Sequence, residues 1–137
     1  MLTKSTILPQ LNTQRSALDE AHEVQTKAIE AGFEWNDDIK GVIAKCHEEL
    51  DELLDEIKAG NSKKAAQELG DVLFSVSIIA YYLGTRPEDC LRESTRKFYR
   101  RFTHVEQRMK EENIPFLQKN LMKMDAFWNE AKTREKR

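Results

Sequence analysis

The sequence has 137 residues, a size that predicts one domain over residues 1–137 burying about two thirds of the surface of its unfolded chain. Charged residues make up 34% of it and the formal net charge is -2, so no global basic field would recruit nucleic acid. It shows no signal-peptide core and no run of about 18 apolar residues, so we expect no membrane partner and a cytoplasmic location.

The first predicted element is a helix over residues 10–31, with Gly32 as its C-cap. Its inward side chains are spaced for one helix face: Leu11, Leu18, Ala21, Ala28 and Ile29. Glycine and proline are few and fall between helical patterns, and no alternating strand pattern occurs. The expected fold class is therefore all-α, a helical bundle of about five helices.

The second predicted helix, over residues 37–59, carries the first of two acidic clusters. Its apolar stripe consists of Ile39, Val42, Ile43, Cys46, Leu50, Leu53, Leu54 and Ile57. The cluster contains Glu48, Glu49 and Glu52, and the last two project from one face because they are three residues apart. Taken alone, such a charge run is more often a solvated helix face than a binding site.

The third predicted helix, over residues 62–83, is apolar nearly all the way round, which predicts burial among other helices. It carries Glu68 and Asp71, which share a face because they are three residues apart. An unpaired carboxylate in such surroundings would cost several kcal/mol, so a positive group must meet them. A divalent metal ion is the leading candidate.

Side-by-side packing of these two helices would bring four carboxylates to one point: Glu49, Glu52, Glu68 and Asp71. Carboxylate oxygens suit Mg²⁺, or Mn²⁺ as its substitute, better than Zn²⁺, for which His and Cys ligands are expected. A carboxylate-bridged di-iron bundle would need paired Glu-x-x-His motifs, and neither acidic cluster has a suitably spaced His. We therefore predict a magnesium site on these two helices.

Two further helices complete the predicted bundle. The fourth follows a capping-box pattern at residues 85–88 and ends before Pro115. Its seam follows steps of four and three: Leu91, Thr95, Phe98, Phe102, Val105 and Met109. The fifth, over residues 117–133, presents Leu121, Met124, Phe127, Trp128 and Ala131. Cys46 and Cys90 stand outside any CxxC pair, and both are predicted to be small core residues.

Basic residues accompany the acidic clusters. Lys45 and Lys64 each precede an acidic residue of the predicted metal site by four positions. Lys97 and Arg101, also four apart, share a face of the fourth helix. Turned toward the acidic site, these cations and a metal ion would together hold a polyphosphate. By spacing alone, two solvated basic residues on a bundle surface explain Lys97 and Arg101 equally well.

The order of these motifs resembles that of the MazG nucleoside triphosphate pyrophosphohydrolases, within the all-α NTP pyrophosphatase superfamily. The matching blocks, between residues 8 and 134, are Gly32-Phe33-Glu34-Trp35, Glu48-Glu49-x-x-Glu52, Glu68-Leu69-Gly70-Asp71-Val72-Leu73-Phe74, Tyr82-Leu83-Gly84 with Pro87-Glu88, Lys97 to Phe102, and Phe127 to Lys132. The chain is most similar to the C-terminal, catalytic half of two-domain MazG proteins. It departs from the family pattern at Asn36, where proline is common.

The resemblance implies a MazG-like domain that hydrolyses nucleoside triphosphates to monophosphate and pyrophosphate with Mg²⁺, in nucleotide-pool control or house-cleaning. The implied metal ligands, which are also catalytic, are Glu49, Glu52, Glu68 and Asp71. Glu48 would be a further catalytic acid that helps to activate water. The implied nucleotide contacts are Lys45, Lys64, Lys97 and Arg101 to phosphates and Trp128 to the base.

Other functions stay open from the sequence. A relative specialised for dUTP, dCTP or phosphoribosyl-ATP would use a similar acidic site, and a substrate panel would separate these. A non-enzymatic helical adaptor would explain the seam and the charged faces but not Glu68 and Asp71 in an apolar helix. The seam and the aromatic last helix also offer more apolar surface than a five-helix monomer hides. Since MazG-like domains generally dimerise, we expect an isologous homodimer.

Overall fold

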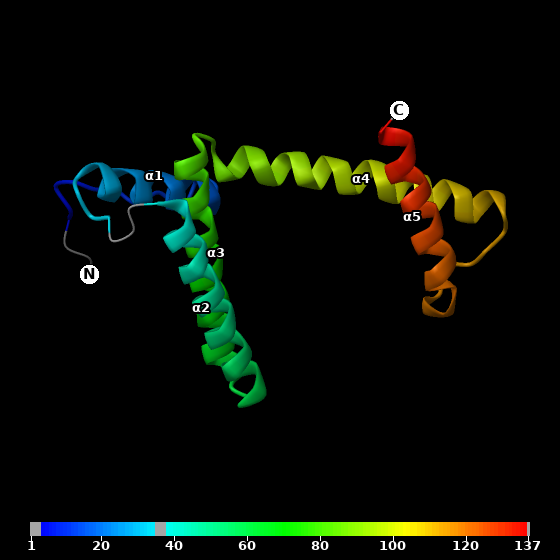
Figure 1. Cartoon of the computed structure of the whole chain (residues 1–137), viewed down its shortest axis with the longest axis horizontal. Coiled ribbons are helices and arrows are strands. Elements are labelled where there is room, and N and C mark those ends of the chain that lie inside the picture. Colours follow the sequence, from blue (N-terminus) through cyan, green and yellow to red (C-terminus); the bar gives the residue numbers. More distant parts are fainter. Residues whose placement is uncertain (1–3, 35–37, 137) are drawn as a thin grey trace. The chain divides into compact units, whose positions relative to one another are not determined.

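The computed structural model describes residues 4–34 and 38–136. All regular structure in these residues is helical, which confirms the prediction of an all-α fold (Figure 1). The elements are the helices α1 (Ala17–Glu30), α2 (Ile39–Lys58), α3 (Ser62–Leu83), α4 (Pro87–Glu111) and α5 (Leu121–Glu135), with the 3₁₀ helix η1 (Gln118–Asn120) before α5. The predicted start of the second helix at Asp37 lies outside the described residues, as do Trp35 and Asn36.

The chain forms two compact units, one up to Cys90 and one from Leu91. The first contains α1, α2, α3 and the start of α4, and the second contains the rest of α4, η1 and α5. The prediction of a single domain over residues 1–137 stays a prediction. Within the described ranges, no helix is both long and apolar enough to cross a membrane.

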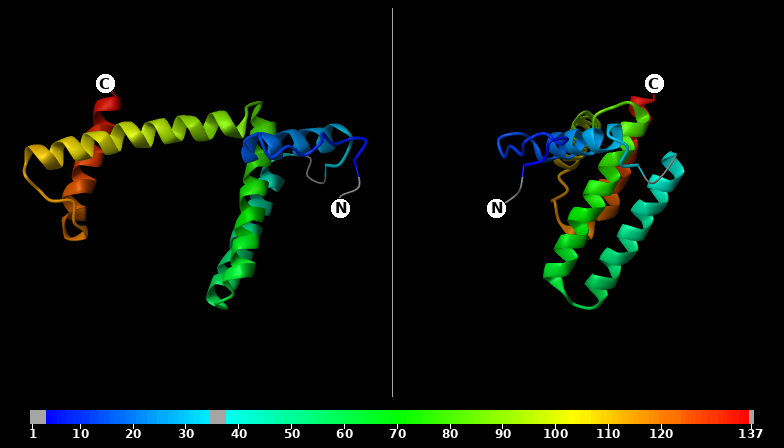
Figure 2. Two further views of the ribbon diagram at one scale, coloured as in Figure 1. Left: turned by 180° about the vertical axis from the view of Figure 1, so that it is seen from behind. Right: turned by 90° about the vertical axis from the view of Figure 1, so that its left-hand side faces the viewer.

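Helices α2 and α3 form an antiparallel hairpin, which the right-hand view of Figure 2 shows most clearly. Gly60 in the turn has a φ of 73°, in the left-handed region that glycine adopts without a steric cost. Asn61 then caps α3, because its side-chain oxygen accepts a hydrogen bond from the Lys64 backbone N–H at 3.1 Å. The buried apolar residues of the hairpin are Val42, Cys46, Val72 and Ala80.

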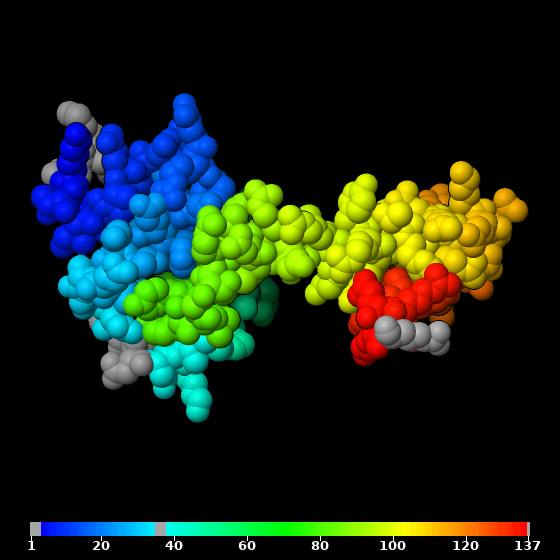
Figure 3. Space-filling view, turned by 90° about the horizontal axis from the view of Figure 1, so that it is seen from above, coloured from blue at the N-terminus to red at the C-terminus, as the bar shows by residue number. Residues whose placement is uncertain are grey.

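Helix α1 packs against α3 near the end that lies away from the hairpin turn (Figures 1 and 2). Gln25 of α1 donates a hydrogen bond from Nε2 to the Phe74 carbonyl oxygen at 2.6 Å. Arg86, just after α3, pairs with Asp19 of α1. Figure 3 shows α1 and the segment before it, in blue, on the surface of the first unit. These contacts fix α1 beside α3, the helix that carries the second acidic cluster.

Helix α1 begins at Ala17, so the predicted start at residue 10 is wrong. Asn12 Oδ1 and Ser16 Oγ each accept a hydrogen bond from a backbone N–H two or three positions further on. Asn and Ser side chains compete with helical backbone bonds in this way, and Ser16 becomes the N-cap. Leu11, predicted to face the core, is consequently 55% exposed.

Helix α3 has the predicted bounds, but the prediction that it is buried on all sides is wrong for the single chain. Among the described residues, only α1 and α2 pack extensively against it. Its most exposed apolar residues are Leu69, Leu73, Phe74, Val76 and Leu83. Those of α2 are Ile43, Leu50, Leu54 and Ile57. Six of these residues are called the apolar hairpin surface below: Leu50, Leu54, Ile57, Leu69, Leu73 and Val76.

The second unit is built around a small core from α4 and α5. Its buried residues are Val105, Met109 and Phe127, with Ile114, Met124 and Trp128 packed against them. Helix α4 ends at Glu111, where Asn113 has a φ of 55° and the Ile114 N–H donates to the Met109 carbonyl at 2.9 Å. Helix α5 begins at Leu121 rather than at residue 117, because η1 occupies residues 118–120.

The predicted seam of α4 is covered only toward its C-terminal end. Met109 is 1% exposed, whereas Leu91 and Phe98 are 54% and 57% exposed. Of the two cysteines, Cys46 is buried as predicted, but the prediction of a core position for Cys90 is wrong. Cys90 lies in the first turn of α4 and is the last residue of the first unit.

Candidate functional site

The central feature of the site is a group of three carboxylates from α2 and α3. Glu49, Glu68 and Asp71 each offer one oxygen, and these oxygens all lie within 4.8 Å of one another. Oxygens bound to one Mg²⁺ are at most about 4.2 Å apart, so movements of under about an ångström would close the group around an ion. The predicted convergence of the two acidic clusters is therefore present for these three residues.

Burial distinguishes the members of this group. Glu49 is 8% exposed and Glu68 is half-buried, whereas Asp71 is exposed to solvent. Glu68 Oε2 is buried and has no hydrogen-bond partner among the described residues. A buried carboxylate oxygen without a partner is costly unless a cation or a donor meets it. The donor set thus fits a hard divalent cation, which can enter from the side of Asp71.

The neighbouring carboxylates change the protonation of Glu68. Burial raises the pKa of the Glu68 carboxyl, and the nearby charges of Glu52, Asp71 and Glu49 raise it further. Glu52 thus belongs to the same electrostatic environment, although it stands outside the group of three. A bound cation would reverse the repulsion between these carboxylates.

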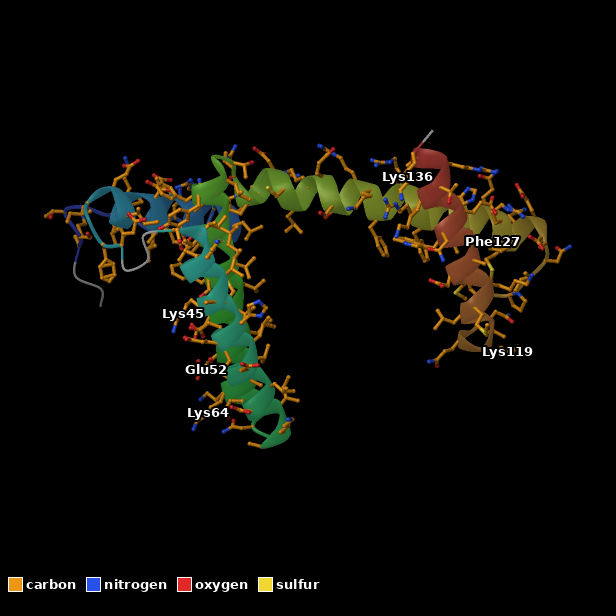
Figure 4. All side chains as sticks on the ribbon, in the orientation of Figure 1. Lys45, Glu52, Lys64, Lys119, Phe127 and Lys136 are labelled. Carbon is orange, nitrogen blue, oxygen red and sulfur yellow. The ribbon has the colours of Figure 1, made fainter. Side chains whose placement is uncertain are left out.

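The three carboxylates Glu49, Glu68 and Asp71 are called the acidic group below. Two lysines lie on the same hairpin. Lys45 Nζ lies 3.3 Å from Glu49 Oε1 and 3.5 Å from Glu48 Oε2, and hydrogen bonding to Glu49 raises the pKa of the lysine. The side chain of Lys64 makes no ion pair within the described part of the chain. Figure 4 shows Lys45, Glu52 and Lys64 projecting from one side of the hairpin. Glu48 is exposed, and its carboxylate contacts Lys45, which also contacts Glu49.

The other predicted nucleotide contacts belong to the second unit. Arg101 donates to Glu135 Oε2 from Nε at 3.0 Å and from Nη2 at 2.8 Å, and its guanidinium lies 5.7 Å from the centre of the Trp128 ring. The ring of Trp128 lies 5.3 Å from that of Phe98. Lys97 is exposed. Arg101 therefore already holds a carboxylate, a group whose geometry resembles that of a phosphate edge.

Sequence reasoning missed Gln25 and the cavity that it lines. The cavity measures about 650 Å³ and lies between α1, α2 and α3, with Lys45 and Glu48 at its edge. A usable signal was present in the sequence. Gln25 is a polar residue on the face of α1 that also carries Ala21 and Ala28, and it is buried in the structure.

Comparison with known proteins gives a consistent result. Residues 38–106 match the family described as the MazG nucleotide pyrophosphohydrolase domain. This match covers half of the chain and includes all three carboxylates of the acidic group, Glu52, the two flanking lysines, Lys97 and Arg101. Trp128 lies beyond it.

Individual proteins from three bacteria are also similar to this chain. The Nucleoside triphosphate pyrophosphohydrolase/pyrophosphatase MazG of Thermotoga maritima is 34% identical over 129 residues, 94% of this chain and 49% of that protein. The Nucleoside triphosphate pyrophosphohydrolase of Escherichia coli K12 is 31% identical over 121 residues, 87% of this chain and 46% of that protein. The Uncharacterized protein YabN of Bacillus subtilis is 40% identical over 70 residues, 51% of this chain and 14% of that protein.

The chain therefore spans about half the length of the two pyrophosphohydrolases that it matches. The family match covers both acidic clusters, from which the fold brings Glu49, Glu68 and Asp71 together on α2 and α3. The chain belongs to the MazG nucleotide pyrophosphohydrolase domain family.

Proposed function

We propose that this protein hydrolyses nucleoside triphosphates to nucleoside monophosphate and pyrophosphate in a Mg²⁺-dependent reaction. The observation that carries this proposal is the group of three carboxylates with an unpartnered buried oxygen on Glu68, flanked by Lys45. Two relatives that match most of this chain are named as nucleoside triphosphate pyrophosphohydrolases, which supports the same reaction.

The proposed ligands of the ion are Glu49, Glu52, Glu68 and Asp71. Bound there, Mg²⁺ would neutralise charge on the phosphate oxygens and activate a water molecule. Mn²⁺, which accepts the same oxygen ligands, would be its substitute. Because α2 and α3 carry these carboxylates on neighbouring helices, the chain would supply a charge environment that is largely formed before substrate arrives.

The reaction joins a water oxygen to the α-phosphorus and breaks the bond from that phosphorus to the oxygen bridging it to the β-phosphorus. Glu48 is proposed to accept the proton that the attacking water loses. Lys45 and Lys64 would bind phosphate oxygens of the departing pyrophosphate. Phosphoryl-type transfer depends mainly on positioning and charge stabilisation, which lysines and carboxylates in these places supply.

The second unit would add further contacts. Lys97 and Arg101 are proposed to bind phosphate oxygens, and Trp128 is proposed to contact the base. Arg101 supports this with its geometry, because the fork that now holds Glu135 can hold a phosphate in the same way. Lys97 and Arg101 would then each stabilise the transition state by about 2–4 kcal/mol if they act like other charge-stabilising donors.

We also propose that the protein forms a homodimer, in which the apolar hairpin surface of one chain packs against that of a second copy. Six large apolar side chains gather there on two neighbouring helices, and each is between 46% and 58% exposed. Exposed large apolar side chains on two packed helices are expected at an interface, because leaving them in water costs free energy. Two unpaired cysteines also fit the reducing cytoplasm as the proposed location.

Product analysis over a panel of nucleoside triphosphates tests the proposed reaction. With Mg²⁺, the first products should be monophosphate and pyrophosphate. Orthophosphate and a nucleoside diphosphate as first products would contradict the proposal. Activity confined to dUTP, dCTP or phosphoribosyl-ATP would keep the chemistry and identify a specialised relative. If neither Mg²⁺ nor nucleotides change the melting temperature of the protein, the reading as a helical adaptor would be favoured instead.

A further inference from the structure

One carboxylate of the second unit is held by two guanidinium groups at once. Glu135, the last residue of α5, accepts hydrogen bonds at Oε2 from Arg101 Nε at 3.0 Å and Nη2 at 2.8 Å. Its other oxygen, Oε1, lies 3.8 Å from Arg100 Nε. Guanidinium groups bind one edge of a phosphate in the same geometry. The Glu135 carboxylate therefore has the surroundings that a bound phosphate would have.

The charge of the second unit favours an anion at this place. The unit carries thirteen Lys and Arg residues and seven Asp and Glu residues, so its net charge of +6 attracts anions. Hydrogen bonding to Arg101 lowers the pKa of the Glu135 carboxyl, and the nearby charges of Arg100 and Lys97 lower it further, against an opposing effect of burial. Glu135 is therefore an anion at neutral pH, as a phosphate is.

The two members of the pair differ in how firmly they are held. The side chain of Arg101 is 16% exposed, and its guanidinium lies 5.7 Å from the centre of the Trp128 ring, a cation–π contact. The side chain of Glu135 is 31% exposed and belongs to the last residue of a helix, where the backbone frays most easily. Arg101 therefore keeps a partner when the pair opens, and Glu135 is the member that can leave.

Stabilisation of the helices does not account for Glu135. A carboxylate in the last turn of a helix lies at the negative end of the helix dipole, where it is unfavourable. The other charged residues of that turn, Lys132 and Arg134, have the favourable sign. The buried core of Val105, Met109 and Phe127 already packs α4 against α5. The cations around Glu135, rather than its own helix, thus favour a carboxylate there.

We propose that Glu135 is an internal competitor of the substrate: in the free protein it occupies Arg101 in place of a phosphate, and the triphosphate displaces it on binding. This inference rests on the proposed function, since it assumes that Arg101 binds a substrate phosphate. The exchange leaves Arg101 paired with an anion in both states. Because the carboxylate must leave before a phosphate enters, Glu135 raises the KM without taking part in the reaction.

The test removes the charge of Glu135. In Glu135→Gln the side chain keeps its shape but no longer competes as an anion. The dissociation constant of inorganic tripolyphosphate with Mg²⁺, measured by calorimetry, should fall about threefold, within the range expected for a partly exposed ion pair. The KM of the best triphosphate substrate should fall by a similar factor, while kcat stays as in the wild type. Glu135→Asp keeps the charge and should restore most of the wild-type KM.

Two controls separate competition at Arg101 from a general change of charge. Glu112→Gln removes the same charge from another ion pair of this unit, with Arg108 at 2.9 Å, and should leave both constants as in the wild type. Arg101→Met removes the group for which Glu135 competes. Adding Glu135→Gln to Arg101→Met should therefore change neither constant further, which a double-mutant cycle measures.

The outcomes distinguish this inference from the proposed reaction. Pyrophosphate release with an unchanged KM and unchanged tripolyphosphate binding in Glu135→Gln would overturn the role of Glu135 and leave the reaction standing. An equal fall of the constants in Glu112→Gln would overturn it too. If no triphosphate yields pyrophosphate, the proposed reaction fails, and tripolyphosphate binding alone decides the role of Glu135. If circular dichroism shows that Glu135→Gln does not fold, Glu135→Ala removes the same charge and should give the same fall.

Discussion

Glu68 is the residue on which the proposed chemistry most depends. Its half-buried carboxylate lies among three other acidic side chains, and one of its oxygens has no partner within the described ranges. Glu68→Gln and Asp71→Asn keep the shape of each side chain but remove its charge. Each change should lower Mg²⁺-dependent kcat/KM by at least about 100-fold, as the loss of other preorganised charge interactions does. Turnover equal to that of the wild type at saturating Mg²⁺ would remove the residue from the site.

The raised pKa of Glu68 also makes a prediction for stability without metal. A carboxyl group whose pKa is raised by folding stabilises the fold while it is protonated, and this contribution is lost as the pH rises through the folded pKa. In EDTA, Glu68→Gln should therefore melt at a higher temperature than the wild type at neutral pH. The difference should shrink as the pH falls and Glu68 takes up its proton. A difference that does not change with pH would mean that the charge of Glu68 is not destabilising.

At the level of the helices, some boundaries could be predicted from the sequence and others could not. The predicted limits of α3, residues 62–83, agree with the structure because Asn61 caps one end and Gly84 adopts the left-handed region at the other. The start of α1 was wrong because the side chains of Asn12 and Ser16 bind backbone N–H groups before the helix begins. Such competition depends on local geometry that hydrophobic spacing does not report.

The same distinction applies to the site. Spacing along a helix identifies residues that share a face, so the pairing of Glu68 with Asp71 could be read from the sequence. Meeting with Glu49 needed the further assumption that α2 and α3 pack together, which the structure supports. Gln25 was not predicted because its burial and its hydrogen bond to Phe74 are properties of packing. The roles of Lys97, Arg101 and Trp128 stay predictions.

The cap of α3 provides a test at this scale. Asn61→Ala removes the acceptor that holds the Lys64 N–H at 3.1 Å, and the free energy of unfolding should fall by about 1 kcal/mol. Asn61→Asp keeps the acceptor and should stay close to the wild type. Urea unfolding followed by circular dichroism measures both changes. An unchanged midpoint for Asn61→Ala would show that the hairpin turn does not need its cap.

For the molecule as a whole, the proposed homodimer rests on the apolar hairpin surface. Leu54→Glu and Leu73→Glu place a charge in the middle of the proposed interface, where it would be desolvated on association, so each variant should be monomeric at micromolar concentration. Light scattering should give twice the chain mass for the wild type and the chain mass for the variants. Ile7→Glu, at a similarly exposed position before α1, should remain dimeric. A wild-type protein of single-chain mass would rule out the dimer.

The contact between Lys45 and Glu49 has a thermodynamic consequence. The amine of Lys45 is the counter-ion of Glu49, which is also a proposed ligand of the metal ion. An ion at the acidic group would release that amine for phosphate, so the two ligands should bind with positive coupling. Linkage makes this reciprocal: a non-hydrolysable triphosphate should tighten Mg²⁺ binding by the same factor by which Mg²⁺ tightens the triphosphate. In Lys45→Met the factor should shrink, and calorimetric titrations performed in both orders would measure it.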